Sequence, residues 1–83
     1  MNMHVTQTKT NLKLIQTLYE TNKQTMYHLA FDILMEEKAA EDTICSCISK
    51  LLEIYDLYPQ MSYRQLERLA YALIRYLAYS INT

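Results

Sequence analysis

Apolar residues recur every three or four positions along most of this chain, the spacing that gathers them on one side of an α-helix. Residues 62–80 and 43–58 each carry such a stripe, opposite a row of polar side chains. In the last helix the predicted apolar side consists of Leu66, Leu69, Ala70, Leu73, Tyr76, Leu77 and Ile81. No window alternates apolar and polar residues in the manner of a strand, so the sequence predicts an all-α fold.

Local signals mark the point where the last two predicted helices meet. Pro59 ends the earlier helix, because the residue before a proline is pushed out of the α region. Ser62 and Gln65 have the spacing of a capping box, and Met61 and Leu66 have that of a hydrophobic staple. The sequence therefore predicts a tight corner at Pro59 and a well-defined start for the last helix.

The first half of the chain predicts one long helix over residues 10–38, with Asn22 in the middle of its apolar stripe. Such a helix would be about 43 Å long, whereas a compact domain of this size is roughly 30 Å across. Either the polar segment 20–25 breaks it, which gives four short helices, or the helix overhangs the rest of the chain. We favour the continuous helix because neither Gly nor Pro marks a break. Asn22 marks either a loop or exposed edge, or a buried asparagine that fixes register and oligomeric state.

The C-terminal half of this long helix carries a second apolar face. Its members are Tyr27, Phe31, Leu34 and Met35. A helix with two apolar faces needs two neighbours, so we expect these residues to form the interface of a homodimer or higher oligomer. The expected architecture is a three-helix bundle with a long first helix, completed by dimerisation.

Composition narrows the class of protein. With 83 residues, 51% of them hydrophobic and 20% charged, the chain is predicted to be a single folded domain over 1–83, with 1–9 as a disordered tail. It has no glycine, which excludes glycine-rich phosphate loops and dinucleotide-binding fingerprints. Neither a signal peptide nor a stretch of about 20 apolar residues is present, so we expect a cytoplasmic protein without a membrane partner. The tyrosine-rich, glycine-free composition is similar to that of small viral proteins, which would place the chain in the host cytoplasm.

Candidate catalytic and metal-binding residues are few. Cys45 and Cys47 would point about 200° apart on a helix, so they are expected to be free thiols rather than a disulfide or a metal site. His28, Asp32 and Glu36 share a helix edge, but ligands from one helix would form only an open, unselective site. No nucleophile, base and orienting group converge in the pattern. The sequence predicts no catalysis, no metal and no cofactor.

Charge is divided along the chain, although the net charge is only −1. Residues 24–56 hold seven acids and two lysines, whereas residues 57–83 hold three arginines and one glutamate. The candidate partner-binding face lies on the last helix and consists of Arg64, Arg68, Tyr71, Arg75 and Tyr79. Arg and Tyr are enriched in protein interfaces, and arginines with tyrosines also suit phosphates and exposed bases. We therefore expect a non-catalytic, homodimeric interaction module that acts as a regulator or accessory factor through protein contact, with a nucleic-acid-binding regulator as the alternative.

Overall fold

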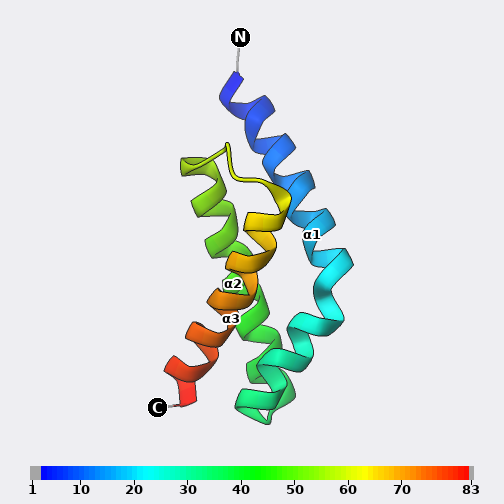
Figure 1. Cartoon of the computed structure of the whole chain (residues 1–83), viewed down its shortest axis with the longest axis vertical. Helices are drawn as coiled ribbons and strands as arrows, with labels where there is room; N and C mark the ends of the chain where they lie inside the picture. The colour runs from blue at the N-terminus through cyan, green and yellow to red at the C-terminus, as the bar shows by residue number, and fades with distance from the viewer. Residues whose placement is uncertain (1–2, 83) are drawn as a thin grey trace.

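The computed structural model describes the backbone of residues 3–82 and the side chains of residues 11–81. These residues form three helices: α1 (Met3–Leu34), α2 (Glu37–Leu57) and α3 (Tyr63–Asn82). α2 returns antiparallel to α1, and α3 crosses α2 while contacting both other helices (Figure 1). The prediction of an all-α bundle of three helices with a long first helix is confirmed.

The long first helix is accommodated by an elongated shape. The molecule measures 47 × 23 × 20 Å, so its long axis matches the roughly 48 Å expected for a helix the length of α1. α1 stays helical through Asn22 but bends near its middle, in the cyan part of Figure 1. There Asn22 Nδ2 donates a hydrogen bond to the carbonyl of Leu18, at 2.9 Å, and a side chain that competes for a helix carbonyl favours a bend.

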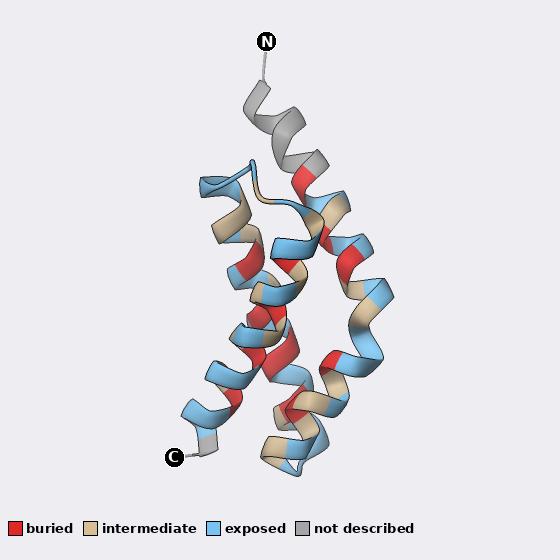
Figure 2. Ribbon diagram, viewed as in Figure 1, coloured by how far each residue is buried: buried red, intermediate tan, exposed pale blue. Residues whose placement is uncertain are grey.

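The core is a single layer of side chains where the three helices face one another (Figure 2). Small residues let the helices approach closely, since Ala30, Ala40, Ala70 and Ala78 are fully buried or nearly so. The largest buried apolar side chains are Ile15, Leu18, Met26, Leu51, Leu66 and Ile74. Deleting several methyl groups from such a site costs about 2–5 kcal/mol, so this layer supplies most of the stability.

The first helix boundary differs from the predicted one. α1 begins at Met3, inside the predicted tail 1–9, and ends at Leu34, and α2 begins at Glu37 instead of residue 43. Met1 and Asn2 lie outside the described residues, so the prediction of a disordered tail stays open for them.

A two-residue link without glycine produces this boundary. Met35 adopts φ 58°, the left-handed conformation, and its N–H donates to the carbonyl of Phe31 at 2.7 Å, which closes the last turn of α1. Glu36 is extended and caps α2, because its carboxylate accepts the N–H of Ala39 at 3.3 Å. Neither Met nor Glu is a typical residue for its position, so the sequence offered no signal for the turn.

The second link follows its sequence signals. α2 ends at Leu57, and Tyr58, which precedes the proline, has φ −129° and ψ 68°, outside the α region. Ser62 Oγ accepts the N–H of Gln65 at 3.1 Å, and Gln65 Oε1 accepts the N–H of Ser62 at 2.8 Å. The predicted capping box and the proline corner are confirmed.

α3 packs along a row that winds around the helix. Its buried residues recur every four positions: Leu66, Ala70, Ile74 and Ala78. Such a row drifts by about 40° per step, and it suits a helix that crosses its neighbour at an angle. Tyr76 and Ile81 were predicted to belong to the apolar side, but they are 69% and 59% exposed because the row has turned away from them.

Candidate functional site

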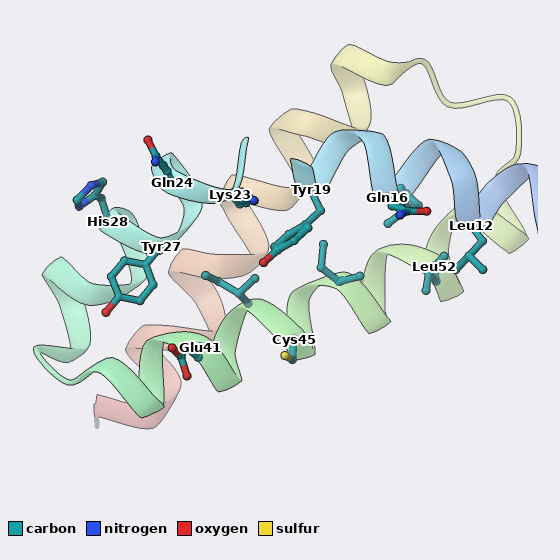
Figure 3. A pocket seen from close by; sticks show the side chains of 13 residues that line it. Leu12, Gln16, Tyr19, Lys23, Gln24, Tyr27, His28, Glu41, Cys45 and Leu52 are labelled. Atoms are coloured by element: carbon teal, nitrogen blue, oxygen red, sulfur yellow. The ribbon is translucent and has the colours of Figure 1, made fainter. Parts of the chain in front are cut away.

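An open groove runs between α1 and α2 on the side of the molecule that α3 does not cover (Figure 3). Its volume is about 1010 Å³, and no residue of α3 lines it. The α1 wall is formed by Leu12, Ile15, Gln16, Tyr19, Lys23, Gln24, Tyr27 and His28. The α2 wall is formed by Glu41, Ile44, Cys45, Ile48 and Leu52.

The walls of the groove have a simple origin in the sequence. One row of α1 faces the inside of the bundle and consists of Asn11, Ile15, Leu18, half-buried Asn22 and Met26. The residue directly after each of these lines the groove, at positions 12, 16, 19, 23 and 27. On α2, positions 41, 45, 48 and 52 follow buried residues in the same way. Each helix therefore has a buried stripe and a second, partly apolar stripe beside it. Together the two stripes are as wide as the face that a helix buries in a four-helix bundle. The described part of the chain holds three helices and none of them covers the second stripes, which stay open to solvent.

Aromatic side chains occupy the wall formed by α1. Tyr19 and Tyr27 are half-buried beside the core, and Tyr19 points across the groove toward α2 (Figure 3). Tyr27 stacks on Phe31 with ring centroids 5.9 Å apart and meets the edge of the His28 ring at 6.2 Å. Partial burial raises the pKa of Tyr27, and the nearby carboxylates of Glu37 and Glu41 add to that effect. The Tyr27 hydroxyl therefore stays neutral and able to donate a hydrogen bond at the mouth of the groove.

The two cysteines have opposite surroundings, as their spacing predicts. Both are free thiols, and Cys45 is exposed in the groove wall. Cys47 lies in the core, where its Sγ is 3.5 Å from the carbonyl oxygen of Ala70, and burial raises its pKa to about 12. Because a thiolate is the reactive form, only Cys45 is open to thiol reagents near neutral pH.

The three predicted contact arginines form an exposed row on α3. Arg64, Arg68 and Arg75 are all exposed, and they lie within about 40° of one another around the helix. The ion pairs among the described residues all involve lysines, so these guanidinium groups are not neutralised within that part of the chain. Tyr79 is also exposed.

Tyr71 is directed away from the arginine row and into a polar cluster between α1 and α3. Its hydroxyl donates to Asn22 Oδ1 at 2.6 Å, and Asn22 Nδ2 donates to Glu67 Oε2 at 3.0 Å. The pKa of Tyr71 is raised, first by burial and then by the Glu67 carboxylate, against a hydrogen bond with Thr25 that lowers it. Asn22 is thus neither in a loop nor at an exposed edge. It joins two helices of one chain through half-buried hydrogen bonds, which favour one register of α1 against α3.

The four residues of the predicted dimer face do not form one open patch. Tyr27 and Phe31 pack partly against the core of their own chain, and Leu34 is half-buried. Met35 is 71% exposed because it stands in the link between α1 and α2. Part of the second apolar face of α1 is therefore packed against the core of its own chain, and the part that lines the groove is Tyr27.

Sequence reasoning missed the α2 wall of the groove. The sequence predicted a single apolar stripe over residues 43–58 and no interface on that helix. A signal was present, since Cys45, Ile48 and Leu52 recur at helical spacing beside the buried Ile44 and Leu51. This stripe indicates a contact with a partner only once the structure shows that α3 does not cover it.

The described residues hold no cluster of three or more His, Cys, Asp or Glu side chains that could bind a metal ion. Within residues 3–82, no helix is both long and apolar enough to cross a bilayer. No protein-family model, curated protein or solved structure matches the chain.

Proposed function

We propose that this chain is a small, non-catalytic interaction module that assembles as a homodimer through the α1/α2 groove and serves as a regulator or accessory factor. The observation that carries the proposal is the groove itself. An apolar trough of about 1010 Å³ along two helices is the surface that an amphipathic helix covers when it completes a bundle. A bundle of this size gains stability from such a partner, since a chain of 83 residues buries a modest fraction of its surface.

The arginine row gives the module a second surface. Because α3 contributes nothing to the groove, a partner in the groove leaves Arg64, Arg68 and Arg75 uncovered. The three arginines have no carboxylate partner within residues 11–81, and exposed guanidinium groups of this kind suit an acidic protein surface, which they bind through charge-assisted hydrogen bonds. The two free thiols accord with a reducing compartment, so we place the module in the cytoplasm, and in the host cytoplasm if the chain is viral.

Two exposed leucines provide a matched test of the groove contact. Leu12 is 52% exposed and lines the groove, whereas Leu57 is 72% exposed and lies outside it. Light scattering at high micromolar concentration should give a mass of twice 9.9 kDa for the wild type and for Leu57→Glu, and a single chain for Leu12→Glu. Equal masses for the two variants would reject the groove as the contact, and circular dichroism of both would show that they remain folded.

The alternative, a nucleic-acid-binding regulator, is supported by the exposed and aligned arginines. Titration with a 20-base-pair DNA duplex at several salt concentrations separates the two functions. Binding by phosphate contacts weakens steeply with salt and falls in an Arg68→Ala/Arg75→Ala variant. If the chain is a protein-interaction module, we expect no binding to the duplex. A DNA affinity that falls steeply with salt would favour the alternative.

A further inference from the structure

The charged residues that line the groove are separated by sign. Among the described lining residues, Lys23 is the one with an ammonium group, and it lies on the α1 wall together with the imidazole of His28. The one carboxylate among these described residues belongs to Glu41, on the α2 wall. Along the groove, Lys23 is placed between the levels of Glu41 and Cys45 (Figure 3). The lining thus has a basic wall and an acidic wall on a common apolar floor.

We infer that a second copy of this chain closes the groove with α1 of each chain antiparallel on α2 of the other, so that Lys23 of one chain meets Glu41 of its partner. This inference rests on the proposed dimer and adds its orientation. A two-fold axis along the groove makes the contact self-complementary, as dimers of identical chains require. The opposite choice, α1 on α1, would bring lysine walls together and leave both acidic walls unmatched.

The order of side chains along the groove suits this orientation. The axis keeps each level of the groove facing the same level of the partner. Leu12 and Leu52 lie at the same end of the groove (Figure 3). Leu12 of each chain would therefore contact Leu52 of the other and bury apolar surface. Tyr27 and Glu41 lie together at the other end, where the neutral hydroxyl of Tyr27 would reach the partner's carboxylate.

Lys23 is free to change its partner. Within its own chain it pairs with Glu20 at 3.2 Å, but both side chains are more than half exposed. Exposed pairs at this spacing contribute little to stability and exchange readily. Moving the Lys23 ammonium from Glu20 to Glu41 of a second copy therefore costs the monomer little.

Charge reversal tests the orientation. Lys23→Glu and Glu41→Lys should each raise the dissociation constant of the dimer about tenfold, because two-fold symmetry repeats each like-charge contact. The double variant Lys23→Glu/Glu41→Lys should return to within about threefold of the wild type. Lys50→Glu and Glu53→Lys, an exposed pair outside the groove, are the matched controls and should leave the dissociation constant unchanged.

Cys45 reports independently whether the groove is covered. Its alkylation by N-ethylmaleimide, followed by mass spectrometry, should slow as the protein concentration is raised through the dissociation constant of the dimer. Buried Cys47 should not react at any of these concentrations. A dimer in which Cys45 reacts as fast as in the monomer would overturn the inference.

The possible outcomes separate the inference from the proposed function. A single chain at every concentration would reject the dimer and the inference together. If Leu12→Glu dissociates the dimer but neither charge reversal changes its dissociation constant, the groove contact would be supported and the orientation overturned. Failure of the double variant to recover would also overturn the pairing of Lys23 with Glu41.

Discussion

Replacing Asn22 by alanine should destabilise the protein by about 2 kcal/mol. The change removes the hydrogen bond that Asn22 receives from Tyr71, at 2.6 Å, and the one it donates to the Glu67 carboxylate, at 3.0 Å. A neutral hydrogen bond contributes about 0.5–1.5 kcal/mol and one to a charged group about 1.5–3 kcal/mol. Two effects reduce the sum: the higher helix propensity of alanine returns about 0.6 kcal/mol, and the half-buried partners regain some water.

The assay is urea unfolding followed by circular dichroism at one fixed protein concentration, because dimerisation makes stability depend on concentration. Thr21→Ala, an exposed neighbour on the same helix, is the control and should stabilise the protein by about 0.6 kcal/mol, the same gain in helix propensity that Asn22→Ala receives. A double-mutant cycle with Tyr71→Phe should give a coupling of about 1 kcal/mol. A triple variant, Asn22→Leu/Glu67→Leu/Tyr71→Phe, should recover most of the loss, because both partners of the two short hydrogen bonds are then removed together. The groups that still lose a partner are the hydroxyl of half-buried Tyr63, 3.5 Å from Asn22 Nδ2, and exposed Thr25. If Asn22→Ala were as stable as Thr21→Ala, the cluster would not hold α1 and α3 in register.

Three further changes test local features of the fold. Met35→Gly should stabilise the protein by about 0.5–1 kcal/mol in thermal unfolding, because glycine adopts the left-handed conformation without steric cost and Met35 buries little surface; a loss of stability would contradict the assigned turn. Thr43→Val should stabilise by about 1 kcal/mol, because Thr43 is buried and its Oγ1 has no hydrogen-bond partner among the described residues; destabilisation would reveal a partner for that hydroxyl. The pKa of Cys47 is raised from its ordinary 9.0 to about 12 in the fold, so its contribution is complete below pH 9 and is lost as the pH rises from 9 toward 12. The free energy of unfolding should fall in that window by up to about 1.4 kcal/mol per pH unit more than in Cys47→Ala, and equal slopes would refute the buried thiol.

Features set by neighbouring residues could be predicted from the sequence. The capping box at Ser62 and the stop at Pro59 depend on contacts within one turn, so their residue types are sufficient evidence. The continuity of α1 followed from the absence of helix breakers. The end of α1 could not be predicted, because Met35 takes a conformation that its side chain disfavours and that tertiary packing imposes.

Features that depend on how the helices cross were beyond the sequence. A helical-wheel analysis assumes a straight stripe, whereas the buried row of α3 winds away from Tyr76 and Ile81. The same analysis placed Tyr71 beside the arginines, and only the position of Asn22 on α1 explains why it turns inward. The groove needs both α1 and α2 in place, so no single stripe predicts it.

The mass of the wild-type protein in solution tests most directly whether the α1/α2 groove is a dimer interface. Multi-angle light scattering from about 1 to 100 μM should show the mass rise from one chain to two, with Leu12→Glu remaining at one chain throughout. A wild-type mass of 9.9 kDa across the whole range would contradict the account, because the apolar groove between α1 and α2 would then stay open to water.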